Sequence, residues 1–497
     1  MARQILDGLL VIFFAVFLFA LAGDGLFIYL SSDDMMNLYW AWETPLPRLL
    51  AANLFPFTTV YRPLGAVVYR TVFAFAGLDP FPFRCLTYIL FLVNLYLTFR
   101  LAKALTGSRE IGILAALAVV FHGRFVHMYA DNGFLYDVLC FPLYLLTILF
   151  YHRVRSRDMP VRGWNLLCLY LLFTAALNAK ELALTLPGVL LAYEIIYHRP
   201  SEHSFSGLKR WLRESALVPL IMLGISIGAY WGKVAPGSPL RGNPAYIPNY
   251  SLDQLTHSVV GYLSELFYLD VHALNPSLAA GYLFVLCALP IVARSRHLAF
   301  CVALMALSPV PVLFCYRAFT SMYIPLAGLG IYLAIVIVCS RDWLLDRLNL
   351  PQRWSPVVGG AARVICFGAI AVLLFTVHLA DIRARPIAQA AKQHQYLRGM
   401  KEDLLQVHQH WPAGSKVLFL DTPYGSHYTA TFLMRLLYQD PTIDVGILGA
   451  NVPDLAFAKE YRYDYVFDYR DGKLVLVGNS VLEERLNRLA LPAGARQ

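Results

Sequence analysis

Long apolar segments alternate with short polar connections along most of this chain. A helix that crosses a membrane needs about 20 mostly apolar residues, because it covers about 30 Å of hydrocarbon at about 1.5 Å per residue. On this criterion we predict about eleven spanning helices. They begin near Leu9, Phe83, Ile111, Phe134, Trp164, Leu182, Ala216, Ala273, Leu298, Met322 and Val357. The first segment is too long for a signal-peptide core, so we expect it to be retained as a helix.

The residues from about 383 onward follow a different pattern. The stretch "QHQYLRGMKEDLLQVHQHW" has helical spacing, "KVLFLD" is typical of a buried strand, and "GSHYTATFLMRLLYQ" is typical of an amphipathic helix. The stretches "DVGIL", "DYVFDY" and "KLVLVG" predict strands, and Asp471 with Gly472 predicts a hairpin between the last two. We therefore predict a mainly α, polytopic transmembrane domain at 1–382 and a small soluble α/β domain at 383–497.

Composition supports a membrane protein. Of the 497 residues, 58% are hydrophobic and 15% charged, whereas about a quarter of the residues in soluble domains are charged. The net charge of +9 does not indicate nucleic-acid binding, because no basic run is interleaved with aromatic residues. The eight cysteines show no CxxC spacing, so we interpret them as buried small side chains rather than disulfides or metal ligands.

The basic residues predict an orientation, because cytoplasmic loops collect Lys and Arg. Basic clusters occur at 100–109, 152–162, 207–213, 293–297 and 341–363. Alternation then places the loops at 33–34, 122–137, 178–181 and 233–272 on the other side. With an odd number of spans, the C-terminal domain also lies there and the N-terminus is cytoplasmic.

Several charged or polar residues fall on this non-cytoplasmic side. They are Asp33, Asp34, Arg62, His127, Asp131, Asp137, Lys180, Glu181 and Arg317. Taken singly, a charged residue at a helix end has a small free-energy cost, because its side chain can be hydrated or can extend to the membrane surface. The acidic pair could equally be a helix cap. As a set they suggest a pocket for an anionic polar substrate. A carboxylate can act as a general base towards a hydroxyl, Arg and Lys can hold a phosphate, and adjacent carboxylates raise each other's pKa or share a cation.

Four motifs in one order resemble the GT-C superfamily of glycosyltransferases. They are "SSDD" at 31–34, "YRPLG" at 61–65, "NAKELALTLPGVLLAYE" at 178–194 and "YRAFTSMYIPLAGLGIYLA" at 316–334. The similarity is greatest to protein O-mannosyltransferase-like and TMTC-like members and to the bacterial relatives that modify lipid A with aminoarabinose. It covers about residues 1–340. The C-terminal domain is similar to the periplasmic domains of bacterial members, which implies a bacterial inner (plasma) membrane protein.

The resemblance implies roles for these residues. The sugar arrives on a polyprenyl phosphate or diphosphate, and the acceptor is a protein or a lipid. Asp33 would be the principal base, Asp34 its partner, and Arg62 would stabilise the leaving phosphate. Lys180 and Arg317 would also bind the donor phosphate. The remaining pocket candidates are Glu181, His127, Asp131, Asp137 and Tyr61.

The resemblance also implies the chemistry. Direct displacement would invert the anomeric centre, so that a β-linked donor would give an α-linked product. No cofactor is required, although a divalent Mg or Mn ion between Asp33 and Asp34 is left open. TMTC-like members often carry "HP-x-H-x-E" where this chain has "HGRFVHMYADNG", in which Asp131 would supply the acid. The tetratricopeptide repeats of that branch are absent, which argues against a eukaryotic-style protein partner.

Alternative functions remain open at this point. A transporter or flippase would tend to show internal repeats and charges near the membrane midplane, and we find no convincing repeat. An oligosaccharide ligase would use a diphosphate donor carrying a whole glycan. A scaffold whose tail binds a periplasmic partner is a third alternative, which full activity of a tail-less chain would weaken.

The loop at 233–272 is rich in Pro, Gly, Asn and Tyr, and loops this long are often functional. We expect it either to close over the acceptor or lipid head group or to be a passive interfacial loop anchored by Tyr residues. If it closes over the site, deletion of 238–250 abolishes transfer while the protein still folds. Unchanged transfer by the folded deletion variant would contradict the closing role.

Overall fold

The computed structural model describes most of the chain. The described residues are 2–120, 122, 128, 131–157, 159–200, 204–236, 247–268, 276–315, 319–347, 355–384, 387–407, 410–421, 427–453, 458 and 460–477. Two candidate site residues, His127 and Arg317, lie outside this set, as do 237–246 and 269–272 of the long loop.

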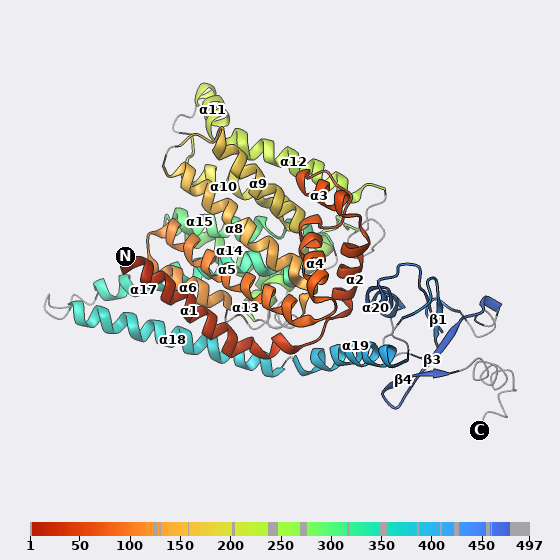
Figure 1. Ribbon diagram of the computed structural model, residues 1–497. Coiled ribbons are helices and arrows are strands. Elements are labelled where there is room, and N and C mark those ends of the chain that lie inside the picture. The colour runs from red at the N-terminus through yellow and green to blue at the C-terminus, as the bar shows by residue number, and fades with distance from the viewer. Residues whose placement is uncertain are drawn as a thin grey trace.

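The described chain is mainly helical, and a helix lies near each predicted span (Figure 1). These helices are α1 (Ala2–Ala22), α5 (Pro80–Thr106), α6 (Arg109–Val120), α8 (Leu135–Arg155), α9 (Trp164–Ala179), α10 (Leu186–Tyr197), α12 (Leu217–Val234), α14 (Pro276–Val292), α15 (Arg296–Leu307), α17 (Tyr323–Arg347) and α18 (Ser355–Ala384). Among the described residues, four helical stretches are long and apolar enough to cross a membrane, namely Pro80–Thr106, Leu135–Arg155, Phe205–Val234 and Tyr323–Arg347. The prediction of a polytopic membrane protein is confirmed, whereas the number of eleven spans stays a prediction.

Several helices lie between the predicted spans. They are α2 (Ser32–Glu43), α3 (Leu46–Leu54), α4 (Pro63–Ala76), α11 (Phe205–Trp211), α13 (Leu252–Phe267) and α16 (Val310–Leu313). Short 3₁₀ segments, η1 (Gly23–Phe27) and η4 (Glu181–Thr185), precede α2 and α10. The acidic pair expected in a loop lies instead in the first turn of α2, so this stretch is helical rather than a simple connection.

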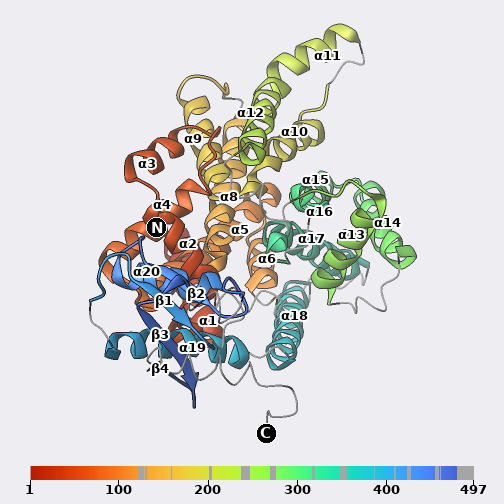
Figure 2. The same cartoon turned by 90° about the vertical axis from the view of Figure 1, so that its right-hand side faces the viewer.

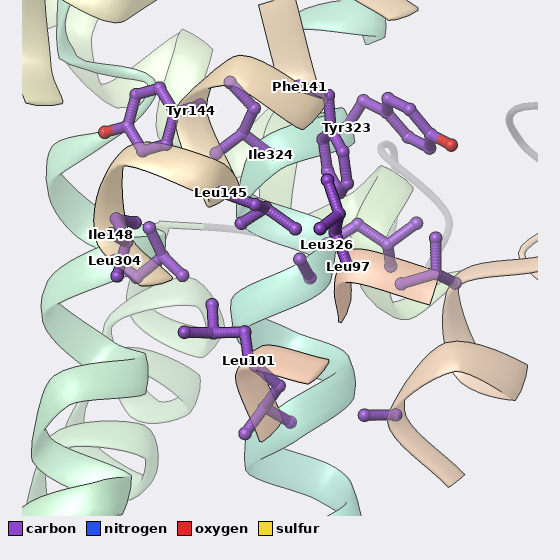
Figure 3. Close-up of a cluster of buried hydrophobic side chains, with 14 of the residues drawn as sticks. Leu97, Leu101, Phe141, Tyr144, Leu145, Ile148, Leu304, Tyr323, Ile324 and Leu326 are labelled. Carbon is purple, nitrogen blue, oxygen red and sulfur yellow. The ribbon is translucent and has the colours of Figure 1, made fainter. Parts of the chain in front are cut away.

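The core of the bundle is formed by α5, α8, α15 and α17, whose side chains interlock in Figure 3. The rings of Phe141 and Tyr323 stack with centroids 4.4 Å apart. Gly330 allows α17 to approach α6, since a Cβ there would lie 2.8 Å from the carbonyl oxygen of Ala115. Close packing of this kind holds helices together in a membrane, where hydrophobic burial between helices gives little driving force.

The C-terminal region, described from Ile387 to Val477, combines two helices with a small sheet. Its elements are α19 (Ile387–Val407), β1 (Lys416–Phe419), α20 (His427–Tyr438), β2 (Asp444–Ile447), β3 (Tyr465–Arg470) and β4 (Lys473–Val477). The sheet order is β2-β1-β3-β4, with β1 parallel to β2 and β3 and with β4 antiparallel. Asp471 (φ 51°) and Gly472 (φ 81°) make the predicted hairpin turn, which needs left-handed residues. The four strands and two helices predicted from the pattern are confirmed.

The C-terminal region packs against α2, and Figures 1 and 2 both show α20 beside that helix. The ring of Tyr39 in α2 stacks on Phe432 with centroids 4.8 Å apart, and Arg435 Nη1 donates to Tyr39 Oη at 3.0 Å. His394 of α19 is buried and hydrogen-bonds to the backbone of Tyr29, just before α2. The region therefore covers the helix that carries Asp33 and Asp34.

Candidate active site

The predicted site residues gather at the end of the helix bundle that faces the C-terminal region, here called the site end. Within the described residues, Asp33, Arg62, Asp131, Asp137, Lys180 and Glu181 form a charged cluster there. Its members come from α2, the start of α4, the start of α8, the α9–η4 junction and the residues before η3 (Asn132–Phe134). Residues more than 100 positions apart meet in this cluster, as the pairing of Arg62 with Glu181 shows.

Asp34 is buried and fixes the start of α2. Its Oδ2 accepts from Ser31 N at 2.8 Å, while Ser31 Oγ accepts from Asp34 N at 3.1 Å, which completes a capping box. The same Oδ2 lies 4.0 Å from Nη2 of Arg84, and both side chains are fully buried. Burial raises the pKa of Asp34 to about 7, with a contribution from the charge of Asp131 and opposed by Arg84. Asp34 thus ties α2 to α5.

Arg84 is held by the chain that leads into α2. Its Nε donates to the carbonyl oxygen of Ile28 at 3.2 Å, and its Nη2 donates to that of Tyr29 at 2.8 Å. The sequence analysis did not select this residue or Ser31. A lone arginine inside an apolar segment and the S-x-x-D pattern of a capping box are the signals that could have found them.

Asp33 remains exposed, in contrast to Asp34. Asp131 lies close to it, because a Cβ built on Gly133 would be 2.9 Å from Asp33 Cβ and 3.0 Å from Asp131 Oδ1. That Oδ1 accepts from Ser31 Oγ at 2.7 Å and from Gly133 N at 2.8 Å. The surrounding protein, and next the charge of Asp131, raise the pKa of Asp33, while Arg62 lowers it. The carboxyl group of Asp131 therefore lies beside Asp33, while Asp34 is buried, and the role of Asp34 as partner of the base stays a prediction.

Arg62 is clamped in a strained position just before α4. Its backbone is left-handed (φ 41°), which a residue with a side chain adopts only when its surroundings enforce it. The guanidinium contacts Oε2 of Glu181 through Nε at 3.1 Å and Nη2 at 2.9 Å. It also lies over the rings of Tyr61 at 4.5 Å and Tyr136 at 5.0 Å. These contacts fix the direction in which the guanidinium points.

The surroundings of Glu181 carry an excess of positive charge. Burial alone would raise the pKa of Glu181, but Arg62, then Lys233 and Lys180, lower it to about 2. Lys233, which the sequence analysis placed only in the long loop, lies at the end of α12 and donates to the carbonyl oxygen of Val60 at 3.2 Å. Three cations therefore lie near one carboxylate, an arrangement that suits an anionic phosphate.

Lys180 is paired, since its Nζ lies 2.5 Å from Oδ2 of Asp137. The Asp137 side chain is 2% exposed and that of Lys180 is 12% exposed. This ion pair joins α8 to the α9–η4 junction, and its net charge is zero. Arg62 and Lys233 together have one carboxylate, Glu181, so they attract a phosphate more strongly than Lys180 does. Its assignment to the donor site stays a prediction.

An apolar cavity of about 440 Å³ lies near Glu181 in sequence, since Leu184, three residues later, is part of its lining. Its lining includes Leu184, Leu223, Ile227, Tyr230, Leu307 and Phe314, from η4, α12, α15 and the chain after α16. The cavity can take an apolar chain, and its lining residues Leu184 and Thr185 belong to η4, the short helix that begins with Glu181.

Asp33 and Asp34 fit a shared metal ion poorly, because Asp33 is exposed and the Oδ2 of Asp34 is engaged with Ser31 and Arg84. Within the described residues, no group of three His, Cys, Asp or Glu side chains is placed to hold a metal. The bridging Mg or Mn ion stays an untested prediction, and we derive no step through it.

The Gly65→Ala substitution is expected to disturb the wall beside Arg62. A Cβ on Gly65 would lie 2.1 Å from Cδ1 of Tyr136, the ring on which Arg62 packs. Overpacking of this kind costs about 1–3 kcal/mol, which would appear as a lower midpoint of thermal unfolding. Gly224→Ala is the matched control, because no atom lies within 4 Å of a Cβ built there. Equal midpoints for the two variants would contradict the packing described here.

Both the sequence and the fold of this chain are similar to those of known proteins. Residues 61–227 match the family described as dolichyl-phosphate-mannose-protein mannosyltransferase. The protein O-mannosyl-transferase TMTC1 of Mus musculus is 33% identical over 147 residues, and that of Homo sapiens is 30% identical over 145 residues. Each alignment covers 27% of this chain, and the chain spans only 15% and 16% of the length of these curated relatives.

The fold is similar to that of ArnT from Cupriavidus metallidurans, whose crystal structure was solved bound to undecaprenyl phosphate. The TM-score is 0.53 at 14% sequence identity, and the match covers 94% of this chain and 98% of that chain. The chain therefore shares the fold of ArnT, and its residues 61–227 are similar to the mannosyltransferase family, in agreement with the resemblance that the order of its motifs indicated.

Proposed function

We propose that this chain is a membrane glycosyltransferase that moves a sugar from a polyprenyl-phosphate donor to an acceptor at the site end. The observation that carries the proposal is the position of Asp33. It is an accessible carboxylate with Asp131 beside it, and Arg62 is near enough to shift its pKa. A base and a phosphate-binding cation are thus close together, which transfer from a lipid phosphate requires.

The donor would bind with its prenyl chain in the apolar cavity beside η4 and its phosphate near Arg62 and Lys233. Asp33 accepts the proton of the acceptor hydroxyl as the hydroxyl oxygen attacks the anomeric carbon. The bond between that carbon and the phosphate oxygen breaks, and the phosphate leaves with the electron pair. Positive groups at the departing oxygen favour this step, and one direct displacement inverts the anomeric centre.

The role of Asp131 leads to a pH prediction. Asp33 works as a base only when ionised, so the rate of transfer falls as pH drops through its pKa. Asp131 raises that pKa, and the Asp131→Asn substitution keeps an acceptor oxygen but removes the charge. The acidic limb of the pH–rate profile is therefore expected to move to lower pH in this variant. Asp342→Asn, at the far end of α17, should leave the limb in place, and an unshifted limb in Asp131→Asn would contradict the role.

Native mass spectrometry of the purified chain with undecaprenyl phosphate tests the donor class. The account predicts that the wild type retains undecaprenyl phosphate in preference to undecaprenol, which has the same chain without the phosphate. In Arg62→Ala the ratio of retained undecaprenyl phosphate to undecaprenol should fall by about tenfold or more, because a charge-assisted contact is lost. Equal retention of the two lipids by the wild type would contradict phosphate recognition at this site.

A further inference from the structure

A second cavity lies between the C-terminal region and the helix bundle. It has a volume of about 360 Å³, which is large enough for a small ligand. Its lining comes from η1, from the turn before α5 and from α19, and it includes Phe27, Tyr29, Asp79, Phe81 and Lys401. Figures 1 and 2 both show α19 close to the end of α1. We refer to it as the α19 cavity, and it shares no residue with the charged cluster.

Tyr29 brings a buried hydroxyl group to this cavity. The residue is 7% exposed, and within the described part of the chain its Oη has no hydrogen-bond partner. Buried hydroxyl groups are nearly always hydrogen-bonded, so this one points to a partner from outside the chain. The residue is held in place, because its carbonyl oxygen accepts from Arg84 and Nζ of Lys401 lies 5.9 Å from its ring centroid. A phenol can donate a hydrogen bond to a phosphate oxygen.

The charged side chains of the α19 cavity sum to zero. Arg398 and Glu402 also line it, but they form an ion pair of 2.9 Å with each other. Lys401 makes no ion pair among the described residues. Asp79 is exposed, and its Oδ1 accepts from Phe81 N at 3.1 Å, which leaves Oδ2 for a cation. A ligand with one negative and one positive charge therefore matches this lining better than an anion does.

The α19 cavity lies at the level expected for lipid head groups. Phe81 is in the first turn of α5, a helix long and apolar enough to cross a membrane, so the cavity is at the end of that helix. The rings of Phe27 and Phe81 are 74% and 46% exposed and stack with centroids 6.3 Å apart. Farther along the two helices, Phe19 of α1 and Ile89 of α5 are also exposed. Acyl chains can contact this apolar surface, whereas a water-soluble ligand would leave it unused.

We propose that the α19 cavity binds the head group of a phospholipid that carries both a phosphate and a primary ammonium group, as phosphatidylethanolamine does. The phosphate would lie between Lys401 and the Tyr29 hydroxyl, the ammonium group at Asp79, and the acyl chains against Phe27 and Phe81. Movement of the flexible Lys401 side chain towards the phosphate would uncover the hydroxyl. The bound lipid would hold α19 on the start of α5. The proposal is independent of the transferase function, because the two sites share no residue.

Native mass spectrometry of the full-length, detergent-purified chain tests this proposal. The probes are phosphatidylethanolamine, phosphatidylglycerol and phosphatidylcholine with identical acyl chains. The wild type is expected to retain phosphatidylethanolamine at least about fivefold over either of the others, which corresponds to one hydrogen bond. Phosphatidylglycerol lacks the ammonium group, and phosphatidylcholine lacks N–H donors. Phosphoethanolamine, the soluble head group, should not displace the lipid at millimolar concentration.

Three substitutions each remove one proposed contact. Tyr29→Phe should lower the retention of phosphatidylethanolamine about fivefold without lowering the midpoint of thermal unfolding, because the hydroxyl has no protein partner to lose. Lys401→Gln should lower the retention of phosphatidylethanolamine and phosphatidylglycerol alike. Asp79→Asn can still cap α5, and it should abolish the preference between these two lipids. Lys473→Gln and Asp471→Asn, exposed in the hairpin of β3 and β4, are the matched controls and should behave as the wild type does.

Four results would overturn the proposal. No preference of the wild type for phosphatidylethanolamine would mean that the cavity does not select this head group. Equal losses in Lys401→Gln and Lys473→Gln would mean general attraction between charges instead of a site. Unchanged retention in a folded Tyr29→Phe protein would exclude the contact of the hydroxyl with the phosphate. Displacement by phosphoethanolamine would identify a soluble ligand. If Tyr29→Phe unfolds, Lys401→Gln and Asp79→Asn decide the question against their two controls.

Discussion

Asp33→Asn is expected to reduce the rate of sugar transfer by about 10²- to 10⁴-fold while the protein still folds. The substitution removes the proton acceptor, and the exposed side chain makes few contacts on which folding depends. The measurement is product formation per milligram of purified protein, with the midpoint of thermal unfolding as the check on folding. A wild-type rate in this variant would remove Asp33 from the mechanism.

Asp34→Asn is the matched comparison, because it makes the same chemical change one residue away. It would leave the guanidinium of Arg84 buried without its counter-charge, and removing one partner of a buried ion pair costs about 3–5 kcal/mol. We therefore expect a lower unfolding midpoint and a lower yield in the membrane, with any loss of rate following the loss of folded protein. If Asp34→Asn were stable but inactive while Asp33→Asn stayed active, Asp34 would be the base and Asp33 would not.

Arg62→Ala is expected to have the second largest effect. It removes the cation proposed for the leaving phosphate, and loss of one such stabilising group costs about 10²–10³ in rate. It also leaves Glu181 without its closest counter-charge, so the free energy of unfolding should fall as well. Arg62→Lys should recover only part of the rate, because an ammonium group cannot reproduce the two contacts of the guanidinium to Glu181.

A double substitution separates these two consequences. In Arg62→Ala/Glu181→Gln the unpaired carboxylate is gone, so stability should return towards that of the wild type. The rate of transfer should remain as low as in Arg62→Ala, because the phosphate still lacks its cation. Recovery of the rate together with stability would show that Arg62 acts only through folding.

The C-terminal sheet was predictable because its signals are local. Strands of alternating or apolar residues and an Asp-Gly turn determine β3 and β4 from a few neighbouring positions. The long apolar segments likewise predicted the main helices. Where Pro and Gly interrupt a segment, as at Pro187 and Gly188 in α10, the helix begins later and is shorter than the pattern suggested.

The site was only partly predictable, because its pairings are between distant residues. The sequence identified Asp33 and Asp34 as a pair, but the capping box at Ser31 turns one carboxylate inward and leaves the other exposed. Neither the pairing of Asp33 with Asp131 nor that of Lys180 with Asp137 is encoded in local spacing. Arg84 was missed since it lies inside an apolar helix, where its partners come from the chain before α2.

The same distance explains why the role of the C-terminal region could not be deduced from its sequence. Tyr39 and Arg435 are 396 positions apart, yet they share a hydrogen bond that holds α20 on α2. The structure supports a bracing role for this region, because α2 carries the proposed base.

The measurement that tests the central claim most directly is a comparison of glycolipids and glycoproteins by mass spectrometry. Host cells would carry the wild type, Asp33→Asn or Asp34→Asn at matched membrane levels of folded protein. The account predicts that one product with the mass of an added sugar disappears in Asp33→Asn and persists, in proportion to folded protein, in Asp34→Asn. That mass would also identify the sugar. If both variants make every product at wild-type levels, the acidic pair is only a helix terminus, and a transporter of lipid-linked sugars becomes the better interpretation.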